Sequence, residues 1–267
     1  MDPLSDVLSL LKPRSYNSGA FALSNDLALR FPRHQGIKCY AIGAGECWLT
    51  LEGMSEPLHL TAGDCFLLPR GLPFSLTTDL ALPPVDYTVA LPALRAAAVE
   101  QRGVGTKHYM VGGHFILSGT HAEFLLKSLP PIVHIRREED KASMRWLLER
   151  MKDELRQPQP GGSLITQQIA YVMLVQALRL HLTDNASQGV GWLFALADRQ
   201  MSVAITCMHD DPGSSWTLQS LAERVGMSRS VFAERFKTKV GLTPMEYLTR
   251  WRMMLAGDRL KSSSESG

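Results

Sequence analysis

The residues best suited to specific chemistry lie in a polar stretch around position 230. Ser230, Ala233 and Glu234 are spaced at i, i+3 and i+4, so a helix would carry them on one face. A carboxylate accepts a hydrogen bond from the cytosine amino group, and an alanine methyl contacts the methyl group of thymine. These three side chains are therefore candidates for reading base edges in the major groove of double-stranded DNA.

Basic side chains surround this triplet and suit a phosphate backbone. Residues 224–261 include nine lysines and arginines against three acidic residues, whereas the whole chain has a net charge of only +2. A local excess of this kind neutralises phosphates, which is the main source of non-specific DNA affinity. The predicted backbone contacts are Arg229, Lys237, Lys239, Arg250 and Arg252. The alternatives are a solvated basic face and, for Glu234, a salt bridge with Arg229 or Lys237.

Two short helices are expected to position these side chains. The first carries one apolar stripe and ends at Gly226, because a left-handed backbone is least costly for glycine. Ser228 then caps the second helix, whose Phe232 and Phe236 face the first one. A Thr-Pro pair restarts the chain into a longer, basic helix. This arrangement is typical of a helix-turn-helix, although an ordinary helical hairpin carries the same stripe.

The first half of the chain has a different pattern. Between residues 20 and 135, short apolar runs alternate with clusters of glycine, proline and aspartate. This spacing predicts an antiparallel β-barrel or sandwich, and the mouth of a barrel is a natural site for a small ligand. The candidate effector pocket consists of Arg33, His34, Lys38, Tyr40 and Trp48. The alternatives are core positions for Tyr40 and Trp48, a solvent-facing Lys38, and loop positions for Arg33 and His34.

Helices replace strands after residue 135. One is predicted over residues 136–156, with Trp146, Leu147, Met151 and Leu155 sharing a face, and a second over residues 163–182 after a Pro-Gly break. The second helix is apolar over more than half of its circumference and must therefore be covered. It packs either on its own barrel or on a partner chain. We expect a homodimer formed through residues 136–185.

A family resemblance adds to this interpretation. The segment WTLQSLAERVGMSRSVFAERFKTKVGLTPMEYLTRWRMMLA closely resembles the first helix-turn-helix and linker helix of AraC/XylS-type transcription regulators. The resemblance implies a sequence-specific DNA-binding regulator that responds to a small-molecule effector. Members of the family normally carry two helix-turn-helix units. Because this sequence continues past Lys261 only as Ser-Ser-Ser-Glu-Ser-Gly, we expect the second unit to be absent and residues 262–267 to be disordered.

The N-terminal half resembles a second family. LHLTAGDCFLLPRGLPFSL is similar to the second half of the cupin signature, and FPRHQGIKCYAIGAGECWLTLEG to the first half. Cupin enzymes bind a metal through two closely spaced histidines, an acidic ligand and a further histidine. Here the first motif offers only His34, with Lys38 four positions on, and the last histidine falls at Phe74. A catalytic metal typically needs three protein ligands, so we expect no metal, no cofactor and no catalytic residues.

Composition limits the remaining classes of protein. With 267 residues, 45% hydrophobic and 20% charged, the chain is long enough for two globular domains. Its four cysteines match no zinc-binding spacing. The N-terminus lacks a basic region and a clear cleavage site, and no apolar run approaches the ~20 residues that span a bilayer. We therefore expect a cytoplasmic protein without a membrane segment.

Together these features predict an α+β protein of two domains. The expected boundaries are 1–135 for the cupin-like effector domain, 136–185 for the dimerising helices, 190–261 for the DNA-binding domain and 262–267 for the tail. The leading hypothesis is a transcription regulator of AraC type that is modulated by an unknown effector. The alternative is a truncated family member that binds effector and dimerises but binds DNA poorly. A cupin metalloenzyme is disfavoured because metal ligands are missing.

Overall fold

The structure is a computed structural model. It describes residues 2–11, 14–22, 27–90, 92, 109–116, 126, 129–135, 137–157, 159–184 and 190–264. Contacts divide the chain into a β-rich unit, Arg14–Ile116 with Pro130–Leu180, and a helical unit, Met1–Pro13 with Leu117–Leu129 and His181–Gly267. The predicted α+β class, with a β-rich N-terminal half followed by helices, is confirmed. Residues 262–264 of the tail predicted to be disordered form the end of a helix, and residues 265–267 lie outside the described residues.

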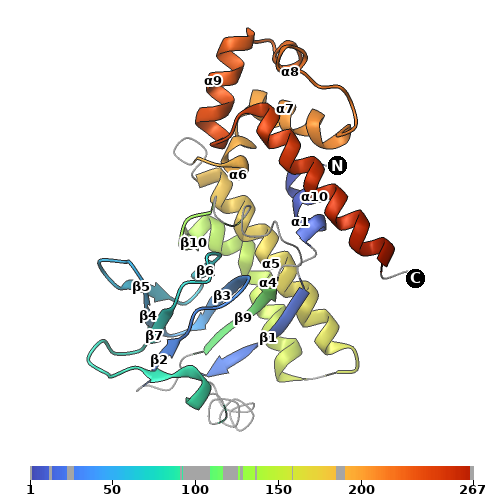
Figure 1. Cartoon of the computed structure of the whole chain (residues 1–267). Helices are drawn as coiled ribbons and strands as arrows, with labels where there is room; N and C mark the ends of the chain where they lie inside the picture. Colours follow the sequence, from blue (N-terminus) through green and yellow to red (C-terminus); the bar gives the residue numbers. More distant parts are fainter. Residues whose placement is uncertain are drawn as a thin grey trace. The chain divides into compact units, whose positions relative to one another are not determined.

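The β-rich unit is built on two five-stranded sheets, shown in Figure 1. Sheet A has the strand order β1-β9-β3-β6-β10, and sheet B has the order β5-β4-β7-β2-β8. The strands are β1 Arg14–Ala22, β2 Ala28–Phe31, β3 Ile37–Ala44, β4 Glu46–Leu51, β5 Leu58–Thr61, β6 Cys65–Leu68, β7 Phe74–Thr77, β8 Val85–Asp86, β9 Tyr109–Ile116 and β10 Val133–Ile135. The pairings found among the described strands are antiparallel, except for the parallel pair β2–β8.

The core of this unit lies between the two sheets. Alternation along β4 sends Cys47, Leu49 and Leu51 into it, and alternation along β3 sends Tyr40 and Ile42 into it. The same alternation places the intervening side chains of β4 on the outer surface. The predicted antiparallel β domain is therefore present. The apolar residues of its strands point into the core, and the residues between them point outward.

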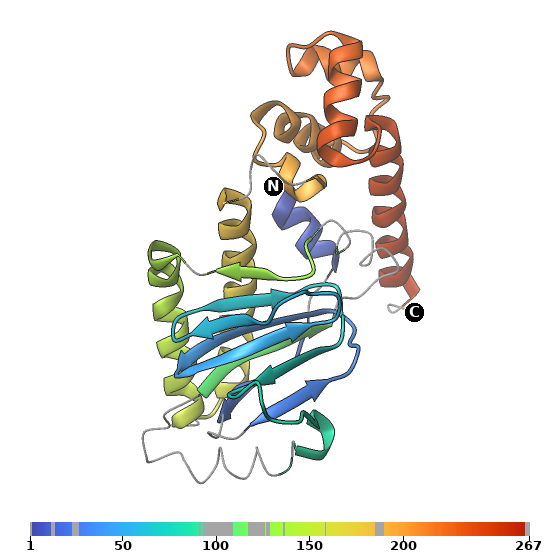
Figure 2. The same ribbon diagram turned by 90° about the vertical axis from the view of Figure 1, so that its left-hand side faces the viewer.

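Two long helices pack on the outer face of sheet A, as Figure 2 shows. They are α4, Glu138–Arg156, and α5, Gly162–Asp184. The approach of α5 is close: a Cβ added at Gly113 in β9 would lie 3.1 Å from the Cβ of Ala170 in α5. Glycine at this position therefore lets the helix backbone approach the sheet.

The buried face of α4 differs from the predicted one at Trp146. This side chain is 70% exposed, whereas Met144, Leu147, Leu148 and Met151 are buried. The four buried residues have the i, i+3, i+4, i+7 spacing of one helical face, and Trp146 lies on the opposite side of the helix. The prediction that Trp146 shares the buried face was therefore wrong, and the predicted Leu155 has a side chain outside the described ones.

A buried ion cluster fastens α4 to the β-rich unit. The Asp64 carboxylate accepts a 2.8 Å hydrogen bond from the Thr61 N–H, lies 2.9 Å from Lys141 Nζ on α4, and lies 3.4 Å from His134 Nε2 on β10. Burial alone would raise the pKa of Asp64. Hydrogen bonds from His134, Thr61 and Lys141 outweigh burial and lower that pKa to about 2.

Removing this carboxylate should destabilise the β-rich unit strongly. Asp64→Ala leaves the Lys141 ammonium without its buried partner, so we expect the free energy of unfolding to fall by about 3–5 kcal/mol. The measurement is urea-induced unfolding of the full chain. The matched control is Glu138→Gln, which removes the other, exposed partner of Lys141 and should cost less than about 1 kcal/mol. Equal losses in the two variants would contradict a dominant role for Asp64.

The helical unit consists of one N-terminal helix and the C-terminal helices (Figure 1). They are α1 Pro3–Leu11, α6 Trp192–Ala195, α7 Arg199–Asp210, α8 Leu218–Arg224, α9 Arg229–Val240 and α10 Pro244–Ser264. The segment between residues 192 and 210 is divided into two helices, α6 and α7. The division occurs because the Asp198 carboxylate accepts hydrogen bonds from the Gln200 and Met201 N–H groups and so caps a new helix.

The N-terminal helix packs on α7 and α10 through a buried polar contact. His209 stacks on Trp251 with ring centroids 3.7 Å apart, its Nδ1 lies 3.3 Å from Asp6, and its Nε2 lies 2.9 Å from the Tyr247 hydroxyl. Burial lowers the pKa of His209 to about 4. A neutral ring satisfies both contacts, because Nδ1–H donates to Asp6 and Nε2 accepts from Tyr247. Thus α1 is grouped with the helical unit, although its sequence lies within the predicted 1–135 domain.

Candidate functional sites

The two helices α8 and α9 form the helix-turn-helix. Gly226 between them has a φ of +68°, and Ser228 Oγ accepts a hydrogen bond from the Val231 N–H, so both predicted signals act as expected. Phe232 and Phe236 are fully buried and hold α9 in the helical unit. The opposite face of α9 is therefore the one that faces solvent.

The base-reading candidates differ in their exposure. Ser230 and Glu234 are exposed, whereas Ala233 is half-buried at the flank of the exposed face. Val231, which we did not predict, is 53% exposed on the solvent face of α9 and presents methyl groups of the kind that contact thymine. No ion pair joins Glu234 to Arg229 or Lys237, all of which lie in the described part of the chain.

The predicted phosphate contacts also fall into two groups. Arg229, Lys237 and Arg250 are exposed, and Lys239 is half-buried. Arg252 is exposed at its surface but donates from Nε to the Pro212 carbonyl at 2.6 Å and from Nη2 to the Ser214 carbonyl at 2.7 Å. These bonds fasten α10 to the loop that precedes α8. The N–H groups of Arg252 therefore donate to protein carbonyls, whereas we predicted that Arg252 would contact DNA phosphates.

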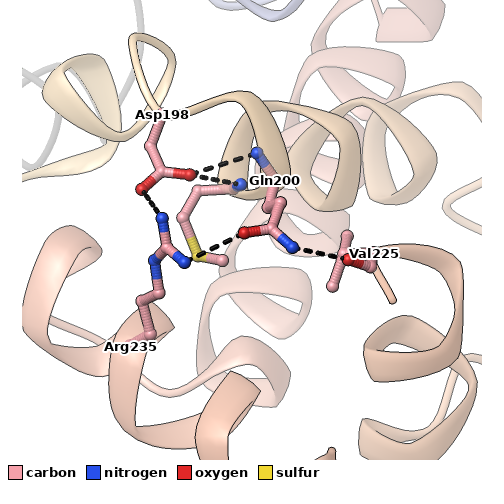
Figure 3. A network of polar contacts seen from close by, with 5 residues as sticks. Asp198, Gln200, Val225 and Arg235 are labelled. Carbon is pink, nitrogen blue, oxygen red and sulfur yellow. Dashed lines mark hydrogen bonds and ion pairs between the residues drawn. The ribbon is translucent and has the colours of Figure 1, made fainter. Parts of the chain in front are cut away.

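An unpredicted arginine positions the second helix. Figure 3 shows Arg235 of α9 bridging to α7: Nη2 lies 2.7 Å from Asp198 Oδ2, and Nη1 lies 2.9 Å from Gln200 Oε1. Gln200 Nε2 in turn donates to the Val225 carbonyl at 2.8 Å. Burial alone would raise the pKa of Asp198, but Arg235 and the capping N–H groups lower it. One network thus joins α7, α9 and the end of α8.

Cutting this network should weaken DNA binding without changing which sequence is preferred. Arg235→Met removes the guanidinium but keeps a helix-forming side chain of similar length, so we expect α9 to be held less firmly. The predicted loss of DNA affinity is about 3- to 10-fold on every sequence, because the pair is partly exposed. Fluorescence anisotropy against a randomised DNA library measures it. Arg145→Met, an exposed arginine of α4, is the control, and a loss confined to particular base pairs would contradict a positioning role.

The second site surrounds Lys38, which is a buried lysine in β3. Its side chain points between the sheets on the same side as Tyr40 and is only 7% exposed. The ammonium lies 4.8 Å from the ring centroids of Phe31 and Phe74 and 5.9 Å from that of Tyr87. Burial lowers the pKa of Lys38 to about 8. Among the described residues, Lys38 has neither a hydrogen-bond partner nor an ion-pair partner.

Two histidines lie next to this lysine. His114 of β9 is the cross-strand neighbour of Lys38, and its ring lies edge-on to His34 with centroids 5.5 Å apart. His34 Nε2 is buried and has no hydrogen-bond partner among the described residues. Burial and the Lys38 charge lower the pKa of His34 to about 4, and burial also lowers the pKa of His114. Both imidazoles are therefore neutral near pH 7.

The structure brings together only part of the predicted pocket. His34 and Lys38 converge, and Tyr40 is buried in the adjoining core. Arg33 is exposed and lies 3.7 Å from Glu52. Trp48 stacks on His59 on the outer face, because the neighbouring β4 residues point into the core. Arg33 and Trp48 therefore do not belong to the site around Lys38. His114 does belong to it, although we did not predict this from the sequence.

Comparisons with known proteins identify the family to which the chain belongs. A sequence model of the cupin family matches residues 2–183, and one of bacterial regulatory helix-turn-helix proteins of the AraC family matches residues 208–249. The chain is therefore a member of the AraC-like transcription regulators with an N-terminal cupin domain. This confirms the predicted resemblance to both families.

Two relatives from Streptomyces support this assignment. The chain is 40% identical to AraC-like transcription regulators described in Streptomyces lividans and Streptomyces antibioticus, over 99% of this chain and 87% of each relative. Among solved structures, ToxT from Vibrio cholerae aligns with a TM-score of 0.32 at 16% identity, over 91% of this chain and 99% of that chain. No helix in the described part of this chain is long and apolar enough to cross a membrane.

A cupin-type metal does not fit the Lys38 site. The position expected to supply a metal-binding histidine is Phe74, and the Lys38 ammonium lies against its ring. His34 and His114 provide two imidazoles, one fewer than a catalytic metal typically requires. A divalent cation would also lie close to a fixed positive charge, which opposes its binding.

Proposed function

We propose that this protein is a sequence-specific DNA-binding transcription regulator whose activity is set by a small molecule bound in the β-rich unit. The observation that carries the proposal is the exposed face of α9. There Glu234 presents a carboxylate without an ion-pair partner among the described residues, next to Ser230. A carboxylate held this way on a recognition helix is suited to a cytosine amino group. The action of such a regulator is expected in the cytoplasm, where bacterial DNA is located.

Phosphate contacts would set the position of α9 on DNA. Arg229 and Lys237 lie near opposite ends of α9 with exposed side chains, and Arg250 is exposed on α10. The charges of Arg229 and Lys237 are available because neither residue forms an ion pair within the described part of the chain. Contacts of this type add affinity on every sequence and make binding sensitive to salt.

The two roles predict different effects of mutation. Glu234→Ala should relax the preference at one base pair, at a cost of about 1–3 kcal/mol on the preferred DNA sequence. Lys237→Ala should weaken binding to all sequences alike and reduce the slope of log affinity against log salt by about 1. Both are measured by selection from a randomised DNA library, followed by anisotropy at two salt concentrations.

The control is Glu223→Ala, because Glu223 is an exposed carboxylate on α8 that pairs with Gln219. It should change neither sequence preference nor salt slope. If Glu234→Ala kept the full preference of the original chain, α9 would not read DNA through this residue. If the original chain showed no preference at all, the proposed function would fail.

Homodimer formation is a further part of this proposal. The α5 helix exposes Leu164, Ile165 and, about two helical turns further along the same side, Val172, and α4 exposes Trp146. Large apolar side chains gathered on neighbouring helices favour a protein–protein contact. A dimer would present two helix-turn-helix units and raise the affinity for paired half-sites.

A charge placed in this surface should separate the dimer. Val172→Glu would put a carboxylate in an apolar contact, so we expect the dissociation constant of the dimer to rise at least about 10-fold. Sedimentation equilibrium measures it. The matched control is Val203→Glu, a valine of similar exposure on α7 in the helical unit, which should leave association unchanged. A monomeric original chain, or equal effects of the two variants, would exclude this interface.

A further inference from the structure

The Lys38 ammonium has an unusual position for a buried charge. Buried charges in proteins are normally paired with an opposite charge, because removing them from water is costly. Here three aromatic rings within 6 Å provide cation–π attraction, which compensates for part of that cost. No described carboxylate completes the pair. The Lys38 ammonium is therefore a buried positive charge without a negative partner among the described residues.

The neighbouring groups share one chemical preference. Lys38 and His114 lie side by side on adjacent strands, and His34 lies edge-on to His114. All three offer nitrogen atoms, and the buried Nε2 of His34 has no partner among the described residues. His34 Nδ1 and His114 Nε2 both face the Gln35 carbonyl, which can only accept, so each neutral ring carries its proton on that nitrogen. Within this set the Lys38 ammonium is the charged donor, and its charge favours an anion rather than a metal ion.

The aromatic rings indicate what is attached to the anion. Phe31 and Phe74 stack with centroids 4.4 Å apart, and Tyr87 stacks on Phe31 at 4.6 Å. Flat apolar surfaces next to a single positive charge suit a molecule with one carboxylate and one apolar body. The energetic cost of burying the ammonium has already been met during folding, so a carboxylate gains the ion pair without it.

We propose that Lys38 is the anchor for an anionic effector, a small monocarboxylate with an apolar body, and that its ammonium takes the place of the metal of cupin enzymes. This inference rests on the proposed function, since it names the ligand class of the same effector domain. The carboxylate lies against the Lys38 ammonium, with His34 and His114 beside it. The apolar body lies against Phe31, Phe74 and Tyr87.

The test uses the full chain with two pairs of probes. Benzoate and hexanoate carry the carboxylate, and benzamide and hexanamide are their neutral counterparts of similar shape. We expect at least one carboxylate to raise the midpoint of thermal unfolding by several degrees at millimolar concentration, and its amide to have no effect. Isothermal titration then gives the dissociation constant of the stabilising carboxylate.

Two lysine variants separate the anchor from a general charge effect. Lys38→Met keeps the length of the side chain and removes the charge, so carboxylate affinity should fall at least about 10-fold. The ligand-free variant should unfold at the same temperature as the original chain or higher, because an unpaired buried charge has been removed. Lys152→Met is the matched control, since Lys152 also lies over an aromatic ring, that of Tyr109, but is partly exposed on α4. It should bind the carboxylate normally.

A second measurement covers the case in which Lys38→Met does not fold. In the original chain, NMR of lysine labelled at Cε should show the Lys38 resonance titrating at a higher pH once the carboxylate is bound. Three results would overturn the proposal: equal stabilisation by acid and amide, unchanged affinity in Lys38→Met, or no stabilisation by either acid at about 10 mM. DNA selection on ligand-free protein is run in parallel, so a failure of DNA reading is distinguished from a failure of carboxylate binding.

Discussion

The arrangement of the DNA-binding helices depends on the carboxylate of Asp198. One of its oxygens caps α7 by accepting two backbone N–H groups, and the other receives the Arg235 guanidinium from α9. The cap begins α7 as a helix separate from α6. Without the arginine, α9 would lose its side-chain link to α7 but would keep its buried Phe232, Phe236 and Val240. The direction of the recognition helix is therefore fixed by a polar contact near its middle and by apolar packing along its length.

Local signals made the helix-turn-helix readable from the sequence. Gly226 and Ser228 act on residues within four positions of themselves, so their effects did not require any knowledge of the tertiary fold. Arg235 was missed for the opposite reason. Its partner lies 37 residues earlier in the chain, and nothing in the polar pattern of α9 distinguishes it from the other exposed basic residues.

The β-rich unit shows the same division between local and distant information. The alternation of short apolar runs was enough to predict antiparallel strands. It did not show which alternate residues of each strand point into the core. Trp48 was misplaced because its neighbours Cys47 and Leu49 occupy the core. His114 joins Lys38 only through the register of β3 and β9, which are 76 residues apart at that pair. Register between distant strands is set by the whole sheet and cannot be inferred from either strand alone.

The contact between α1 and α7 has a consequence for the order of assembly. Asp6 and His209 are separated by 203 residues, so α1 gains this contact only after the chain has been synthesised as far as α7. Contacts of such long sequence separation form late and slowly, because a large loop must close before they are gained. Until then His209 lacks the Asp6 partner of its Nδ1, and the helical unit is complete only when α1 and the later helices α6–α10 are all present.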